Sequence, residues 1–400
     1  MYPSEKIGIT SFRTTNFDFN GGLFKEKEDF IVQEIENDGE ILSTNTNDSG
    51  AIIPENKKDF LIFTLIKKGV STQDALKTIS RDNHVGIKRI GYLGNKDRNA
   101  ITSQRISLFK GDANTLKKGY GRFFIKDLAY ADSGCKIGAL YGNRFTIRIR
   151  DFIGKKDLDA FLSEIRDGMP NFYGPQHFGT SALNIAISKS VVGRNFKQAM
   201  IDFAFTERDE SGVAKSARGT LKDTFYDYVT GDSDLDHVKA NEVLSSLPGF
   251  MHSETSMIRH LLGNRHDYIG ALRSVPKYFL LLIIQSLQAY VFNLTLSRLD
   301  PKGDLSETLP TIGYDLELSK LTPNVRDAVD SVLAEEKLDD LAKLEIKEMP
   351  EASLKTFERE TLVYPENLAY DSDGNDVILH FDLKKGAYAT IFLLEMFKRF

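Results

Sequence analysis

Strand-like patterns at both ends of the chain enclose a long helical stretch, and this order constrains the fold more than any other feature. Residues 60–66 form an apolar run rich in β-branched and aromatic side chains, which predicts a buried strand. Between residues 180 and 350 the apolar positions recur with helical spacing. Strand patterns return at residues 367–370 and 377–383, which predict a hairpin around the polar turn 371–376. We therefore expect an α+β chain whose two ends build one sheet around an inserted helical domain.

The N-terminal half contains further local patterns. Residues 105–109 and 144–150 predict strands, and the second alternates apolar and polar positions. Its alternating residues are Phe145, Ile147 and Ile149 on one face and Thr146, Arg148 and Arg150 on the other. Residues 71–83 and 156–167 have helical spacing and helix-ending signals. The glycine-rich, basic segment 86–98 lies between them, and we expect it to be mostly loop.

Charge is unevenly distributed along the chain. The whole sequence contains 52 Lys or Arg and 57 Asp or Glu, a net charge of −5, which by itself argues against a nucleic-acid binder. Residues 88–150, however, contain 14 basic and 4 acidic residues, a net charge of +10. Residues 300–376 contain 8 basic and 20 acidic residues, a net charge of −12. The basic stretch is a candidate surface for an anionic partner, although a solvated charged face is the plainer explanation.

Two sequence features bear on the cellular location of the protein. Cys135 is the single cysteine, and the sequence has no cluster of Cys and His for zinc, so we expect a cytoplasmic protein without a structural metal. Residues 278–297 lack charge over a length that could span a bilayer. Because Gln285, Gln288 and Asn293 interrupt this stretch, we expect a buried core helix and no membrane contact.

Common cofactor motifs are absent from the sequence. Gly86 and Gly91 have the spacing of a phosphate-binding loop, but Tyr92 and Leu93 stand where that loop requires Lys and Ser or Thr. Motifs for dinucleotide binding, zinc proteolysis and serine hydrolysis are also missing. We therefore expect no nucleotide or other cofactor and no metal.

Asp97 is a candidate nucleophile. It lies between Lys96 and Arg98 at the end of the glycine-rich segment, and flanking cations stabilise the ionised form of a carboxylate. Lys-Asp pairs are also common by chance, so spacing alone leaves catalysis open.

Six segments of the chain resemble motifs of the tRNA pseudouridine synthase D family. Residues 94–104, Gly-Asn-Lys-Asp-Arg-Asn-Ala-Ile-Thr-Ser-Gln, resemble the family's Gly-x-Lys-Asp-x-x-Ala-x-Thr-x-Gln, whose aspartate is the catalytic nucleophile. The other five resembling segments, in the family's order, are residues 23–34, 142–145, 171–179, 288–293 and 385–390. The first of them lacks the family's proline and is one residue short, which affects the register of Lys25. Gln33 replaces an acidic residue, and His177 and Leu394 replace arginines.

The resemblance implies a fold and a reaction. The fold is a pseudouridine synthase-type catalytic domain with a mixed, largely antiparallel sheet, expected at residues 1–171 and 351–400. A mainly helical domain is expected as an insertion at residues 172–350. The activity is that of an isomerase that converts a uridine of tRNA, expected at position thirteen, to pseudouridine without a cofactor. The expected partner is tRNA, with other RNA possible in addition, and no protein partner is indicated.

The resemblance also implies the residues of the site. Asp97 is the expected nucleophile, attacking either the ribose or the uracil ring, and Lys25 is the expected lysine paired with it. The residues expected to bind the flipped uridine are Phe30, Asn143, Phe145 and Tyr388. The residues expected to bind the RNA backbone are Lys88, Arg89, Arg148 and Arg150, with Lys110, Lys117 and Lys118 as further phosphate partners. Gln104 and Thr102 are expected to brace the loop that carries Asp97.

Two other functions remain open from the residues. One is an RNA-binding or RNA-chaperone protein that has the same scaffold without the reaction. The other is a Mg²⁺-dependent phosphate-ester hydrolase that uses Asp97.

Overall fold

Contacts divide the chain into two units in this computed structural model, which describes residues 3–46, 57–116, 119–210, 212–231 and 233–399. The sheet unit comprises residues 14–169 and 363–392, and the helical unit comprises residues 1–13, 170–362 and 393–400. The predicted α+β class with a mixed, largely antiparallel sheet is confirmed.

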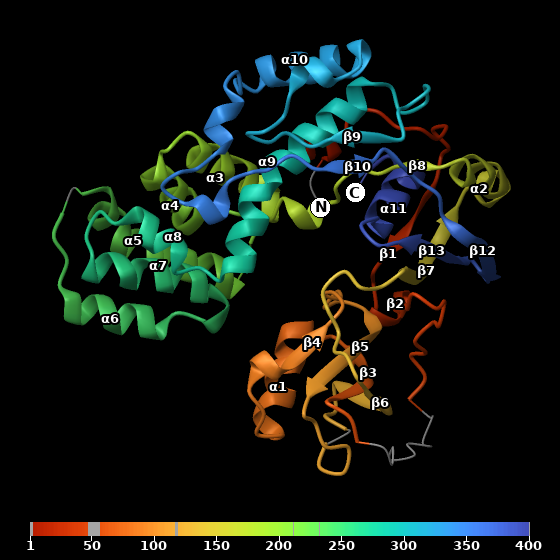
Figure 1. Ribbon diagram of the computed structural model, residues 1–400, viewed down its shortest axis with the longest axis horizontal. Coiled ribbons are helices and arrows are strands. Elements are labelled where there is room, and N and C mark those ends of the chain that lie inside the picture. The colour runs from red at the N-terminus through yellow and green to blue at the C-terminus, as the bar shows by residue number, and fades with distance from the viewer. Residues whose placement is uncertain (1–2, 47–56, 117–118, 211, 232, 400) are drawn as a thin grey trace. The chain divides into compact units, whose positions relative to one another are not determined.

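A nine-stranded sheet forms the centre of the sheet unit (Figure 1). Its main strand order is β12-β13-β7-β2-β5-β3-β6, with β1 paired to β7 and β4 paired to β5. The pairing of β2 with β5 is parallel, and the other pairings in this sheet are antiparallel. The strands are β1 (Asn20–Leu23), β2 (Phe30–Ile35), β3 (Phe60–Lys68), β4 (Ile90–Tyr92), β5 (Ile101–Phe109), β6 (Phe123–Ala131), β7 (Gly142–Ile153), β12 (Glu366–Asp373) and β13 (Asp376–Lys384). The predicted C-terminal hairpin is therefore present as β12 and β13, and it pairs with β7 from the N-terminal half.

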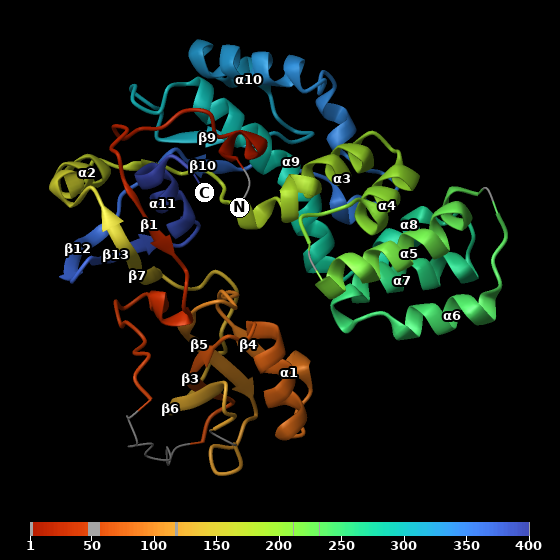
Figure 2. The ribbon, with the colours of Figure 1, turned by 180° about the vertical axis from the view of Figure 1, so that it is seen from behind.

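Both helices predicted in the N-terminal half are present in the sheet unit. Helix α1 (Thr72–Asp82) begins where the Ser71 hydroxyl accepts a hydrogen bond from the Asp74 amide, which satisfies a free donor of the first turn. Its apolar side belongs to one buried cluster with β3 and β5, and Figure 2 shows the helix beside these strands. Helix α2 (Leu158–Arg166) buries the four apolar residues that predicted it.

Three strand boundaries differ from the prediction. Strand β5 begins at Ile101 rather than at residue 105, because its first residues are polar side chains that become buried between β2 and β3. Strand β3 continues through Lys67 and Lys68, which looked like a break in the apolar run. The segment 86–98 contains the short strand β4, so the loop itself covers only residues 93–100.

The helical unit is organised around a long buried helix, α9 (Lys277–Arg298). Among the described helices, α9 is the one long and apolar enough to cross a membrane, and 67% of its apolar window is buried within the protein. Its polar side chains bind the backbone of crossing segments. The Asn293 amide donates to the carbonyls of Ile7 (2.9 Å) and Tyr173 (3.0 Å), and Gln288 donates to the carbonyl of Lys355 (2.9 Å). These contacts agree with the core helix expected from the sequence.

The remaining elements belong to the helical unit or cross the points in the sequence where one unit ends and the other begins. The helices are α3 (Leu183–Val192), α4 (Phe196–Phe205), α5 (Gly212–Thr230), α6 (His237–Ser246), α7 (His252–Gly263), α8 (Tyr268–Arg273), α10 (Pro323–Glu335) and α11 (Ala389–Phe397). The short strands are β8 (Met169–Pro170), β9 (Thr308–Pro310), β10 (Glu358–Glu360) and β11 (Leu362–Val363). The predicted division assigned residues 1–13, 170–171, 351–362 and 393–400 to the catalytic domain, whereas their contacts place them in the helical unit.

Candidate active site

One face of the sheet gathers polar side chains from four strands. Thr102 on β5 lies opposite Val32 on β2 and opposite Lys67 on β3. Glu34 on β2 lies opposite Asn143 on β7. Because side chains alternate along a strand and paired residues share a face, Lys67, Thr102, Glu34 and Asn143 belong to one face of the sheet. We call this the site face.

The loop that carries Asp97 is fixed to the site face by a short hydrogen-bond network. The Gln104 amide donates to the Gly94 carbonyl (3.1 Å), so Gln104 braces the loop as expected. The Thr72 hydroxyl donates to Gln104 (2.8 Å) and accepts from the Lys96 amide (3.0 Å). The helix α1, the strand β5 and the loop are thereby joined at one point.

Lys67 lies beneath the loop and was not identified from the sequence. Its side chain is only 1% exposed, and its Nζ donates to the backbone carbonyls of Asp97 (2.5 Å) and Lys96 (3.1 Å). Burial lowers the pKa of Lys67 to about 8, although the nearby Asp97 charge favours the protonated form. Lys67 therefore holds the loop backbone and supplies positive charge next to Asp97.

The Asp97 residue is exposed at the surface, yet protein atoms crowd its carboxyl group. This desolvation raises the pKa of Asp97 above its usual value, while the charges of Lys67 and Lys96 act to lower it. The sequence predicted that the flanking cations set the ionisation of Asp97. That prediction needs correction, because desolvation is the largest effect and the second cation is Lys67 instead of Arg98.

Glu34 orients the other lysine of the site. The Lys96 ammonium lies 2.6 Å from the Glu34 carboxylate, and both side chains are buried. The second oxygen of Glu34 accepts from the Arg105 amide (2.7 Å). Burial raises the pKa of Glu34, and Lys96 opposes this effect. In the part of the chain that the structure describes, no three His, Cys, Asp or Glu side chains are grouped to hold a metal ion.

Lys25, the lysine expected beside Asp97, makes no ion pair with it among the described residues. It is exposed, and its aliphatic chain passes over Gly22, where an added Cβ would be 3.1 Å from the Lys25 Cε. In the shortened segment, Lys25 is followed by a tight turn at Lys27–Asp29. The Glu26 amide donates to the Asp29 carboxylate (2.8 Å) and closes this turn. The lysine charges that act on the Asp97 carboxyl are those of Lys67 and Lys96, so the structure does not pair Lys25 with Asp97.

The expected aromatic residues form part of a stacked row. Phe30 and Phe145 are 8% and 6% exposed, and their ring centroids are 6.2 Å apart and nearly parallel. Phe145 also stacks on Phe381 (5.4 Å), so both rings are packed in the core of the sheet unit. Tyr388 is half-buried immediately before α11. A role for these rings in binding a base stays a prediction.

Two buried acceptors on the site face have no hydrogen-bond partner among the described residues. They are the hydroxyl oxygen of Thr102 and the amide oxygen of Asn143. Thr102 was expected to brace the Asp97 loop, and its hydroxyl makes no such contact. A buried polar atom without a partner costs about 1–3 kcal/mol of stability. The preceding Gly142 is required by close packing, since an added Cβ would lie 2.1 Å from the Leu383 carbonyl oxygen.

Most cations expected to bind the RNA backbone are already engaged. Arg148 pairs with Asp373 and Asp376 (both 2.8 Å), and Arg150 pairs with Asp29 (2.8 Å). Both arginines lie on the face of β7 opposite Asn143 and Phe145, because side chains alternate along the strand. The Arg89 guanidinium donates to the carbonyls of Phe109 and Lys110, whereas Lys88 is exposed. Lys117 and Lys118 lie outside the described residues.

Two departures from the family motifs belong to the helical unit. His177 is packed against Tyr173 (5.1 Å between rings) in the helical unit. Burial and the nearby Arg359 lower the pKa of His177 to about 4, so this position carries no positive charge at neutral pH. Leu394 is a buried residue of α11.

Comparison with known proteins assigns the chain to a family. The family model "tRNA pseudouridine synthase D (TruD)" matches residues 6–309 and 301–396. The "Probable tRNA pseudouridine synthase D" of Methanosarcina mazei is 29% identical over 456 aligned positions, which cover 98% of this chain and 97% of the relative. A relative with the same name from Methanopyrus kandleri is 28% identical and covers 84% of each chain. The crystal structure of the M. mazei protein assigned to TruD matches with a TM-score of 0.69 and 27% identity, over 100% of this chain and 99% of that chain. The chain belongs to the tRNA pseudouridine synthase D family.

Proposed function

We propose that this chain isomerises a uridine of tRNA, at position thirteen as the family resemblance implies, to pseudouridine, with Asp97 as the nucleophile. The observation that carries the proposal is the exposed residue Asp97 on a loop whose backbone is held by Lys67, Thr72 and Gln104. A nucleophile must be both reachable and fixed in place, and this loop provides both properties.

The reaction needs no external electrons. The bond between the ribose C1′ and the uracil N1 breaks, the base turns, and C1′ is joined to the uracil C5. The hydrogen on C5 leaves as a proton and N1 gains a proton, so the product is an isomer of the substrate. Because the target atoms are inside the stack of folded RNA, the uridine must be extruded before Asp97 can reach it.

The residues around Asp97 then have distinct tasks. The charges of Lys67 and Lys96 oppose the rise that desolvation causes in the pKa of Asp97, and Glu34 fixes Lys96. The free amide oxygen of Asn143 is an acceptor for an N–H or O–H group of the extruded nucleotide. These tasks require neither a bound metal nor a nucleotide cofactor.

Tritium release from tRNA labelled at the uracil C5 tests the proposal, together with mapping of the modified position. Conversion at position thirteen supports it. Binding of tRNA without conversion, under conditions in which a family enzyme of known activity works, would identify an RNA-binding protein without the reaction and reject the proposal. Conversion at another uridine only would reject the assigned position.

The pH dependence of the reaction should depend on Lys67. The rate is expected to fall as the pH drops through the pKa of Asp97, which lies above the usual value, because only the carboxylate attacks. The rate should fall again above pH 8, where Lys67 loses its proton. Lys67→Met removes a cation that lowers the pKa of Asp97, so the acid limb should move to higher pH and the alkaline limb should disappear. Turnover at neutral pH should decrease about 100-fold, since the loop also loses its support.

The matched control is Lys77→Met, which removes an exposed lysine from α1. Its pH profile should equal that of the wild type. An unchanged profile in Lys67→Met would show that Lys67 does not act on Asp97.

A further inference from the structure

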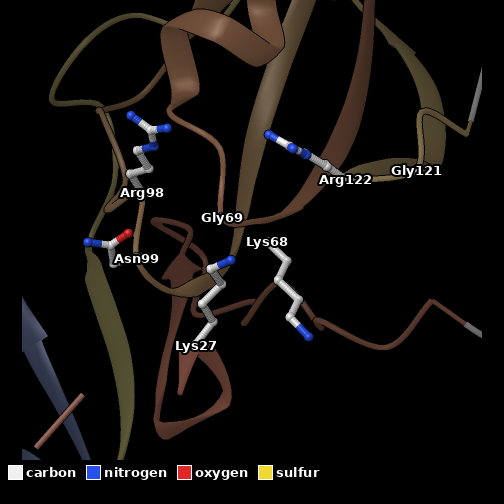
Figure 3. A pocket seen from close by; sticks show the side chains of 7 residues that line it. All are labelled: Lys27, Lys68, Gly69, Arg98, Asn99, Gly121 and Arg122. Atoms are coloured by element: carbon white, nitrogen blue, oxygen red, sulfur yellow. The ribbon is translucent and has the colours of Figure 1, made fainter. Parts of the chain in front are cut away.

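A basic pocket next to the Asp97 loop has no role in the reaction as described so far. The pocket has a volume of about 540 Å³ and is lined by Lys27, Lys68, Gly69, Arg98, Asn99, Gly121 and Arg122 (Figure 3). Four of these residues are cationic and none is acidic. The lining therefore favours an anion.

Four separate segments bring these cations together. Lys27 comes from the turn before β2, Lys68 from the end of β3, Arg98 from the Asp97 loop and Arg122 from the residue before β6. The Lys68 amide donates to the Arg122 carbonyl (2.9 Å), which ties two of the segments. The pocket is thus built by the same strand ends that hold the Asp97 loop.

The positive charge of the pocket is largely unneutralised. Lys68 pairs with Glu28, whereas Lys27, Arg98 and Arg122 have no ion pair with a described residue and are all exposed. By contrast, Arg148 and Arg150 on β7 are paired with aspartates. Arg98 and Arg122, which belong to the basic stretch 88–150, are therefore available here, whereas Arg148 and Arg150 of the same stretch are not.

Two glycines with positive φ line the pocket, and Gly69 leaves the space that Lys27 occupies. Gly69 has φ +68°, and an added Cβ there would lie 2.7 Å from the Lys27 Nζ. Gly121 has φ +75°, a backbone conformation that favours glycine. A side chain at Gly69 would displace Lys27 from the pocket.

The lining also indicates which part of a nucleotide would bind. No aromatic or aliphatic side chain lines the pocket, so it offers no surface on which a base could stack. Guanidinium and ammonium groups suit the oxygens of a phosphate, and arginine binds them in a forked geometry. The ligand class is therefore the phosphodiester backbone.

We propose that this pocket binds the RNA backbone phosphates that flank the uridine attacked by Asp97. The inference rests on the proposed function. Arg98 and Asn99 directly follow Asp97 in the chain, so phosphates held here are adjacent to the nucleophile. Contacts on the flanking phosphates hold the strand while the target nucleotide turns out of the stack.

The test measures binding of a tRNA transcript at several salt concentrations for the double variant Lys27→Met/Arg122→Met. Neither side chain neighbours Asp97 in sequence. Each lost phosphate contact reduces the slope of log affinity against log salt by about 0.7 to 0.9. The double variant should therefore lose about 1.4 to 1.8 from this slope and bind about tenfold more weakly at low salt. The conservative variant Lys27→Arg/Arg122→Lys keeps both charges and should restore most of the affinity.

Lys77→Met serves again as the control, and thermal unfolding shows whether each variant is folded. A folded double variant with the affinity and salt slope of the control would overturn the inference. If wild-type protein binds tRNA through the pocket but converts no uridine, the proposed function fails and the pocket assignment stands.

Stabilisation of the protein by inorganic phosphate, measured at constant ionic strength, tests whether the pocket binds free phosphate instead of RNA. If the double variant loses stabilisation by phosphate but keeps its affinity for tRNA, the pocket is a site for free phosphate and the inference is wrong.

Discussion

Asp97→Ala is expected to lower the turnover of tRNA uridine by about 10⁴-fold or more, because removal of a nucleophile leaves only the contribution of binding. Asp97→Asn should be similarly inactive, since the amide keeps the shape of the side chain without its negative charge. Neither change should weaken the binding of tRNA, because each removes an anion from a basic region. The measurement is tritium release under single-turnover conditions together with tRNA affinity.

Asp132→Ala is the matched control for this loss. Asp132 is an exposed carboxylate of the same unit, and its side chain pairs with the surface residue Lys58 (2.7 Å). Its removal should leave turnover near the wild-type value. Wild-type turnover in Asp97→Ala would show that another group performs the attack.

Glu34→Gln is expected to destabilise the sheet unit by about 3–5 kcal/mol, because it leaves the buried Lys96 ammonium without its carboxylate partner. Turnover should also fall sharply, since Lys96 would leave its place beside Asp97. Hydrogen exchange of the backbone amides of β2 and β5 would locate the destabilised region. The most direct probe is the Arg105 amide, which donates to Glu34.

Replacing both partners should cost less than replacing Glu34 alone. Burial raises the pKa of Glu34 despite the nearby Lys96 charge. The free-energy cost of removing the two charges from water therefore offsets most of the attraction between them. In Glu34→Gln/Lys96→Met we therefore expect partial recovery of stability without recovery of turnover. Asp132→Asn, which breaks an exposed pair, should change stability by less than about 1 kcal/mol. A similar small change in Glu34→Gln would show that the Lys96 charge finds water or another partner.

Elements with a complete local pattern were predictable from the sequence. Helices α1 and α2 bury the apolar residues that indicated them, and the hairpin β12–β13 surrounds the polar turn that separated its two apolar runs. The face alternation of β7 is also confirmed. In each case a single segment contains both the periodicity and the signals that end it.

The site is built by strand and ion pairs between segments that are far apart in the sequence, and local sequence patterns do not reveal such pairs. Lys67 is two residues beyond Leu65 on the same face of β3, so alternation placed it inward, but its charge made it look like a strand end. Arg148 and Arg150 were on a basic face as predicted, yet their aspartate partners come from the C-terminal hairpin and from the turn before β2. The Lys25 position depended on a turn whose length differs from the family motif. The division into a discontinuous catalytic domain and an insertion stays a prediction.

The pairing of β7 with β13 has a consequence for synthesis of the chain. Residues 154–375 separate the two strands, so β7 emerges from the ribosome long before its partner exists. At about 5–20 residues per second this delay is on the order of 10–40 s. Throughout that time the strand carrying Asn143 and Phe145 has an open edge, which is a template for pairing with other chains. Completion of the site face therefore waits for the last segment of the protein to be translated.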